Sequence, residues 1–163
     1  MPIKGKNSKL QFIKDDLQEI GDQQFMIWAV FSPEIQLIKN TLKSDYAVGV
    51  LDGSVSKDDR KEVVNDFKQG LIQGLISHPE VGGYGLNLQG AGIQYWYSRN
   101  YRTEARLQGE DRSHRIGISE SPIYKDLVYN VRWEHEVLQS NKDGADLNAN
   151  FMSKDINELF EVL

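Results

Sequence analysis

Two arginines, Arg112 and Arg115, stand three residues apart in the run 108–117, which Gln108 opens. Arginine is always charged, and its planar guanidinium can donate two parallel hydrogen bonds to a phosphate. This spacing can therefore aim two guanidinium groups at one phosphate. On a solvated helix face the same arginines would pair with neighbouring acids such as Glu110, and the spacing alone favours that more common use.

A second segment, residues 81–88, is dense in glycine and contains Gly82, Gly83 and Gly85. Glycine accepts backbone angles that other residues resist, so its amides can approach a ligand closely. The segment comes directly after a predicted strand, and in an open parallel sheet ligands gather at the carboxyl ends of strands. We therefore expect it to contact a ligand, whereas the alternative is a tight connection that happens to need three glycines.

The elements that must position these residues alternate between apolar runs and amphipathic stretches, which is typical of a parallel sheet flanked by helices. The expected strands are residues 24–31, 46–51, 71–77, 93–97 and 123–129. The expected helices are residues 8–20, a helix starting at Ser32, residues 56–69, a helix capped by Thr103 and a helix starting near Arg132. This order of elements predicts an α/β domain.

Serine and glycine mark the expected helix ends. Ser8, Ser32 and Ser56 are expected to cap the first three helices, because a serine hydroxyl accepts a hydrogen bond from a first-turn amide. Gly21 and Gly70 are expected to end the first and third helices. The side chains expected to face the core are Leu10, Ile13, Leu17, Ile20, Ile35, Ile38, Leu42, Val63, Val64 and Phe67.

Taken in chain order, four segments resemble motifs of superfamily-two helicases, specifically of Swi/Snf-type DNA translocases, a family with short phage-encoded members. The segments are residues 26–32 (motif IV), Asp52-Gly53-Ser54 followed by Arg60 and Phe67, residues 81–88 (motif V) and residues 108–117 (motif VI). The resemblance covers about residues 24–131. It implies the second lobe of such an enzyme, a RecA-like three-layer α/β domain with a mostly parallel central sheet flanked by helices.

The resemblance also implies roles for individual residues. Both motif VI arginines contact the nucleotide across the interlobe cleft in the family, which implies that Arg112 and Arg115 are catalytic arginine fingers. The residues implied in nucleotide binding are Gln108, Gly83, Gly85, Arg112 and Arg115. The residues implied in DNA-backbone contacts are Ser32, Ser54, Lys57, Gly82 and Asn87, with a cap or turn role as the alternative for the serines. The aromatic run 95–97 is expected to be buried strand rather than a base-stacking surface.

ATP and Mg2+ are expected to act in the complete two-lobe enzyme, with neither bound tightly by this lobe alone. The sequence contains no Gly-x-x-x-x-Gly-Lys-Ser/Thr loop and no strand ending in the Asp-Glu pair that holds magnesium. The expected partners are a first RecA-like ATPase lobe, on the same or a separate polypeptide, and the backbone of double-stranded DNA. Alone, the chain is expected not to hydrolyse ATP at a useful rate.

Three segments depart from the family pattern. Ile118 stands where a glutamine commonly comes after motif VI, and His78-Pro79 stands where Ser-Thr often precedes the motif V glycines. Residues 132–135, Arg-Trp-Glu-His, stand where the family often begins a helix with Thr-Val-Glu-Glu. These differences concern the coupling mechanism and the end of the lobe, while the predicted fold is unchanged.

The length and composition of the chain exclude several classes of protein. The 163 residues suffice for one sizeable core, and the lack of cysteine excludes disulfides and thiolate metal sites. No metal site is expected, since His78, His114 and His135 lack paired spacing. No apolar run approaches the roughly 20 residues of a membrane span. We therefore expect no membrane partner and a cytoplasmic location, which is the host cytoplasm for a phage-encoded chain.

Charge divides the chain into two expected parts. The net charge is −5, and residues 143–163 hold five acids against one lysine. We expect residues 1–142 to form the lobe and residues 143–163 to form an acidic linker with a short amphipathic helix. That helix is expected to dock on the lobe rather than on another protein through an apolar face made by Ile156, Leu159, Phe160 and Leu163.

Two other functional classes stay open on the sequence alone. The first is a stand-alone DNA-binding or regulatory module without ATPase activity. The second is a nucleotide-binding enzyme of the Rossmann type, such as a methyltransferase. Against the second, the glycine cluster comes after the third predicted strand rather than the first, and no acid ends the next strand to hold a ribose.

Overall fold

The computed structural model describes residues 7–82, 91–99, 122–129, 134–136 and 139. The elements are α1 (Ser8–Ile20), β1 (Phe25–Trp28), α2 (Ser32–Leu42), β2 (Val48–Leu51), α3 (Lys57–Lys68), β3 (Gly74–Ser77), α4 (Pro79–Gly82), β4 (Ile93–Trp96) and β5 (Ile123–Asp126). Residues 134–136 are also helical. The predicted α/β order is confirmed within these residues, whereas the helix expected after Thr103 and the tail 143–163 lie outside them.

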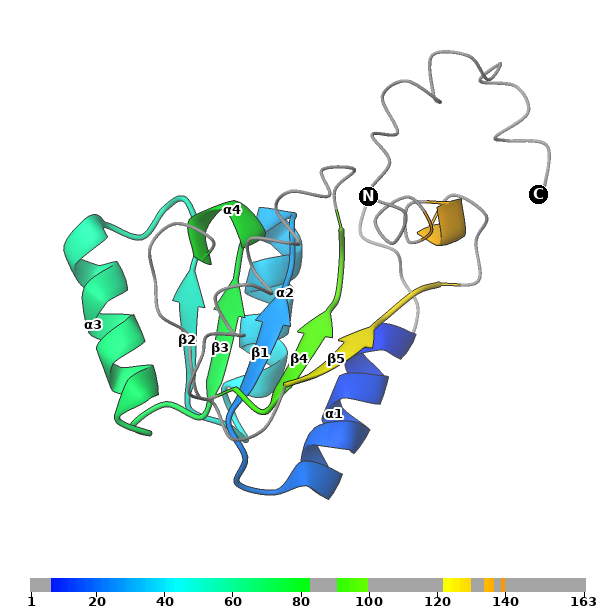
Figure 1. Ribbon diagram of the computed structural model, residues 1–163, viewed down its shortest axis with the longest axis horizontal. Helices are drawn as coiled ribbons and strands as arrows, with labels where there is room; N and C mark the ends of the chain where they lie inside the picture. The colour runs from blue at the N-terminus through cyan, green and yellow to red at the C-terminus, as the bar shows by residue number, and fades with distance from the viewer. Residues whose placement is uncertain (1–6, 83–90, 100–121, 130–133, 137–138, 140–163) are drawn as a thin grey trace, which may run out of the picture.

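The strands form one parallel sheet in the order β2-β3-β1-β4-β5 (Figure 1). The ladders are in phase, because Phe25 at the start of β1 pairs with Gly74 of β3 and with Ile93 of β4. The carboxyl ends of all five strands therefore lie at the same edge of the sheet. Helices on both faces complete the predicted RecA-like arrangement of three layers.

Alternate strand residues face opposite helical layers. On β1, Phe25 and Ile27 pack with α1 and α2, whereas Met26 and Trp28 pack with α3. The helix residues buried in these two cores are Leu10, Ile13, Leu17, Ile35, Ile38, Leu42, Val64 and Phe67. Ile20 and Val63 are partly buried against the same cores. The predicted inward faces of the first three helices are thus confirmed.

Each strand is shorter than the apolar run that predicts it, and β1 covers four residues of the expected 24–31. Backbone hydrogen bonds continue past the strand ends, since the Ala29 amide donates to the Ser77 carbonyl at 3.1 Å and the Tyr97 amide donates to the Trp28 carbonyl at 2.9 Å. An apolar run reports burial, and buried chain continues beyond the regular ladder. Apolar runs therefore overestimate strand length.

Of the three serines predicted to cap helices, Ser56 does so, at the start of α3. The prediction for Ser8 was wrong, because Asn7 is the last extended residue before α1 and its Oδ1 accepts from the Leu10 amide at 3.1 Å. The prediction for Ser32 was also wrong, because the chain stays extended to Phe31 and Ser32 is the first residue inside α2. Residue type alone does not fix the cap, since the backbone chooses the last extended residue.

Two glycines end helices as expected, whereas a third lies in a helix rather than in the expected turn. Gly21 and Gly70 come after α1 and α3 with φ of 64° and 73°, a region that favours glycine. Gly82, expected in a glycine-rich turn, is instead the last residue of the short helix α4. The rest of the glycine segment, residues 83–88, lies outside the described residues.

The aromatic run 95–97 is buried, as expected, with Tyr95 and Trp96 in β4 and Tyr97 directly after that strand. Trp96 stacks on Trp28 of β1, with ring centroids 5.3 Å apart and planes inclined by 17°. The Trp28 indole N–H donates to Oε1 of Gln94 at 2.8 Å. These contacts fix the centre of the sheet on the α3 side.

Gly74→Ala tests how tightly β3 packs. A methyl group at residue 74 would overlap the Phe25 ring and approach Val48, whereas a methyl at Gly53 meets nothing within 4 Å. We expect Gly74→Ala to lower the free energy of unfolding by about 1–3 kcal/mol. The matched control Gly53→Ala should change it by less than about 0.5 kcal/mol in the same urea denaturation. Equal effects of the two substitutions would contradict this packing.

Candidate functional site

The candidate site is the carboxyl edge of the sheet, where parallel strands deliver the segments that come after them. In parallel α/β sheets this edge is where ligands bind. The segments begin with Ala29 after β1, Asp52 after β2, His78 after β3, Tyr97 after β4 and Leu127 after β5. The parallel topology therefore brings Ser32, Ser54 and Gly82, three of the residues expected to contact DNA, to one edge.

The segment after β2 is a turn built around Asp52, which is 5% exposed. Its Oδ1 accepts from the Ser54 amide at 2.9 Å and from the Ser54 hydroxyl at 2.5 Å. Nη2 of Arg60 in α3 donates to the Asp52 carbonyl at 3.2 Å, and Phe67 of the same helix is fully buried. The pattern Asp-Gly-Ser followed by Arg and Phe thus fastens this turn to α3.

Two residues expected to contact DNA lie on or beside this turn. Ser54 already gives both its amide and its hydroxyl proton to Asp52, so a phosphate could take the hydroxyl proton only by releasing that bond. Lys57 is exposed as the first residue of α3 and is followed directly by Asp58 and Asp59. These acids partly offset the positive charge of Lys57.

Ser32 is exposed at the amino end of α2, where the first-turn backbone carries partial positive charge. Phe31 beside it is 56% exposed. Phe31 makes no side-chain cap hydrogen bond, and the acid Glu34 lies in the same first turn.

His78 shapes the segment after β3. Its Nδ1 accepts from the Glu80 amide at 3.2 Å, while its carbonyl accepts from the Val81 amide at 3.0 Å. The imidazole thus caps α4, a task that serine and threonine usually perform at helix starts. Gly82 ends the same helix.

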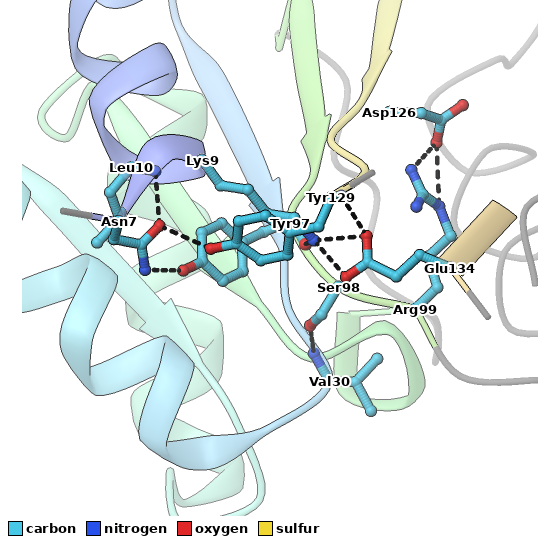
Figure 2. A network of polar contacts seen from close by, with 10 residues as sticks. All are labelled: Asn7, Lys9, Leu10, Val30, Tyr97, Ser98, Arg99, Asp126, Tyr129 and Glu134. Atoms are coloured by element: carbon cyan, nitrogen blue, oxygen red, sulfur yellow. Dashed lines mark hydrogen bonds and ion pairs between the residues drawn. The ribbon is translucent and has the colours of Figure 1, made fainter. Parts of the chain in front are cut away.

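A polar network that the sequence did not predict joins the segments after β4 and β5 (Figure 2). It is centred on Lys9 of α1, which is 7% exposed and forms an ion pair with Glu134 at 2.9 Å. Nearby, Nη2 of Arg99 contacts Oδ1 of Asp126 at 2.6 Å. One signal was available in the sequence, because Lys9 lies four residues before Ile13 and therefore on the apolar face of its helix.

Glu34, in the first turn of α2, interacts with Ser98 and with the charge of Lys9. Burial raises the pKa of its carboxyl, against the opposing effects of a hydrogen bond with Ser98 and the charge of Lys9. Within the described residues its buried Oε2 has no hydrogen-bond partner. Ionisation of Glu34 therefore lowers the stability of the folded protein.

Several expected features concern residues that the structure does not describe. Gln108, Gly83, Gly85, Asn87, Arg112 and Arg115 stay predictions, as does the structural role expected for His114. Among the described residues, no group of three or more histidines or acids could hold a metal ion. Among the described helices, none combines the length and apolar character that crossing a membrane requires.

Glu34→Gln tests the electrostatic cost of Glu34. Since the folded-state pKa lies above the ordinary 4.5, the folded protein binds this proton more tightly than the unfolded chain, and stability is lost as the pH rises through the folded pKa. The uncharged variant avoids this loss. Its stability relative to wild type should rise between about pH 4 and about pH 7 in urea denaturation. Glu62→Gln is the control, because Glu62 is exposed on α3. An equal rise in relative stability with pH in Glu62→Gln would contradict the cost assigned to ionised Glu34.

Comparisons with known proteins identify the family. The helicase conserved C-terminal domain matches residues 8–117, more than half of the chain. The ATP-dependent helicase fft2 of Schizosaccharomyces pombe is 26% identical over 165 residues, covering 96% of this chain and 13% of its own length. The TATA-binding protein-associated factor MOT1 of Saccharomyces cerevisiae is 33% identical over 103 residues, covering 60% of this chain and 6% of its own length. The chain thus spans a small part of each relative.

Solved structures show the same fold. The C-terminal part of the Fun30 ATPase domain matches 80% of this chain and 44% of its own, with a TM-score of 0.73 and 24% identity. The C-terminal domain of the DEAD-box protein Dbp5 matches 86% of this chain and 80% of its own, with a TM-score of 0.73 and 15% identity. The chain therefore belongs to the helicase conserved C-terminal domain family, with relatives that are Swi/Snf-like ATP-dependent helicases.

Proposed function

We propose that this chain is the second lobe of an ATP-dependent translocase of double-stranded DNA. In this role it supplies arginine fingers and DNA-backbone contacts to a first ATPase lobe on the same or a separate polypeptide. The observation that carries the proposal is the family match over residues 8–117, which contains both the glycine segment and Arg112 and Arg115. The shared edge of the parallel sheet supports it, because that edge is where such a lobe would meet its ligands.

The chemistry proposed for Arg112 and Arg115 is neutralisation of charge that develops on the γ-phosphate oxygens during hydrolysis. Gln108, Gly83 and Gly85 would contact the same nucleotide. When bound, ATP would supply the phosphoryl group. Mg2+ held by the first lobe would neutralise charge on that group. The two lobes would thus divide the work, with the metal on one side of the nucleotide and the arginines on the other.

The DNA contacts proposed here are to phosphates, because a motor that moves along DNA must not depend on sequence. Ser32 offers an exposed hydroxyl at the amino end of α2, and Lys57 offers an exposed ammonium group. Ser54, Gly82 and Asn87 complete the proposed set. With a net charge of −5 on the chain, binding depends on these local contacts rather than on a general attraction to DNA.

The alternative is a stand-alone DNA-binding or regulatory module without ATPase activity. It is favoured by the lack of a phosphate-binding loop anywhere in the 163 residues. In this case the chain would bind duplex DNA without stimulating ATP hydrolysis in a first lobe. An assay of ATP hydrolysis in the presence of the first lobe therefore separates the two functions.

Arg112→Ala and Arg115→Ala test the fingers in a mixture, or a fusion, of this chain with its first lobe. DNA-stimulated ATP hydrolysis should require both parts. Each substitution should lower kcat by about a thousandfold or more, because an arginine finger typically contributes at least that much. Lys68→Ala, an exposed cation on α3, is the control and should leave kcat unchanged. Hydrolysis by the chain alone, or full activity in the arginine variants, would contradict the proposal.

Lys57→Ala tests the DNA contact of α3. Duplex affinity should fall equally for unrelated sequences, and the slope of log Kd against log salt should decrease by about 1. Lys61→Ala is the matched control, because Lys61 lies on the same helix and already pairs with Asp58 at 3.0 Å. Titration of a labelled duplex at several salt concentrations measures both. An equal loss in Lys61→Ala would mean that general charge, not a Lys57 contact, determines binding.

A further inference from the structure

The ammonium group of Lys9 is buried and makes three hydrogen bonds. Its Nζ donates to the Tyr97 carbonyl at 3.0 Å and to Oε1 and Oε2 of Glu134 at 2.9 and 3.0 Å. It also lies 4.3 Å from the ring centroid of Tyr129. Lys9 therefore joins the start of α1 to three residues that come after β4 and β5 (Figure 2).

Glu134 completes the connection from the other side. Its Oε2 also accepts from the Tyr129 amide at 2.6 Å. Asn7 adds two further bonds, since its Nδ2 donates to the Tyr97 hydroxyl at 2.6 Å and its Oδ1 accepts from the Tyr129 hydroxyl at 3.2 Å. The segments after β4 and β5 are thus held by side chains and backbone together.

This ion pair is poorly explained by stability alone. Removing two charges from water carries a penalty that their attraction often fails to exceed, and apolar replacements of buried pairs are frequently neutral or stabilising. Burial and the charge of Arg99 lower the pKa of Lys9, against the opposing hydrogen bond and charge of Glu134. What the pair does provide is a specific position for the groups it bonds.

The segment that this pair positions leads directly into the arginine-bearing stretch. Tyr97 to Arg99 are the last described residues before 100–121, the stretch that contains Arg112 and Arg115. Arg99 is itself tied to Asp126 of β5 by Nε at 3.2 Å and Nη2 at 2.6 Å. Residues 97–99, which precede this stretch in the sequence, are therefore held from two directions.

The same segment is also tied to β1. The Val30 amide donates to the Ser98 hydroxyl at 2.9 Å, and Val30 lies two residues before Ser32. This bond gives residues 97–99 a further attachment.

We propose that Lys9 and Glu134 are positioning residues for the arginine fingers, acting by holding residues 97–99 at the carboxyl edge of the sheet. This inference rests on the proposed function, because it assigns a task to residues outside the nucleotide site. Neither side chain touches the reacting atoms. Catalysis depends on such positioning, since a shift of about 1 Å can cost about a hundredfold in rate.

Lys9→Met and Glu134→Gln test the proposal in the two-lobe assembly. Each should lower kcat for DNA-stimulated hydrolysis by about tenfold to about a hundredfold, with little change in the KM for ATP or in DNA affinity. The double variant should lose no more than the more severe single variant, because both remove one unit. A loss of DNA affinity or a raised KM in place of the kcat effect would overturn the proposal.

The matched control is a second ion pair between α1 and the sheet. Nζ of Lys125 contacts the two carboxylate oxygens of Asp16 at 2.7 and 2.6 Å, but Lys125 lies within β5 rather than after β4. Lys125→Met should therefore leave kcat unchanged at a temperature where both variants are folded. An equal loss of kcat in Lys125→Met would reduce Lys9 to a general structural role.

Hydrogen exchange of the chain alone provides a readout that does not require activity. In Lys9→Met the Tyr129 amide and the amides of residues 97–99 should exchange faster, while amides in the centre of β1 keep their protection. Unchanged exchange at these sites would overturn the proposal. If the wild-type assembly proves inactive, the proposed function fails, and the exchange result still decides whether Lys9 holds this segment.

Discussion

The structure depends on one requirement, that backbone groups stay hydrogen-bonded where the buried parallel strands end. The ladders satisfy this requirement inside the sheet, and side chains satisfy it at the carboxyl edge. One backbone group after each strand is bonded by a side chain: Val30 by Ser98, Ser54 by Asp52, Glu80 by His78, Tyr97 by Lys9 and Tyr129 by Glu134. The edge that would meet ligands is therefore a set of braced segments rather than five independent loops.

Much of the fold could be predicted from local pattern. Apolar runs identified the strands, and the spacing of Ile35, Ile38 and Leu42 identified the inward face of α2. Positions of caps and strand ends could not be predicted as well, because they depend on where the backbone leaves the extended conformation. Asn7 and Ser8 are both good caps by type, and only the structure shows which of them precedes the first helical turn.

The site was less predictable for a different reason. Motif order located Ser32 and the Asp52 turn, but a motif does not distinguish a side chain that binds a ligand from one that holds the turn. Asp52 and Ser54 bond each other, so at least part of that motif has a structural cause. Lys9 and Glu134 are 125 residues apart, and no local pattern could have paired them.

The stacked pair Trp28 and Trp96 has a consequence for how this domain can be observed. They are two of the three tryptophans in the sequence, and their rings are nearly parallel at the junction of β1 and β4. Indoles in such contact couple their strong electronic transitions, which gives a characteristic pair of circular dichroism bands in the far ultraviolet. The two tryptophans thus give the domain an intrinsic spectroscopic signal from the middle of the sheet. Unfolding of the sheet can be followed by this signal without an added probe.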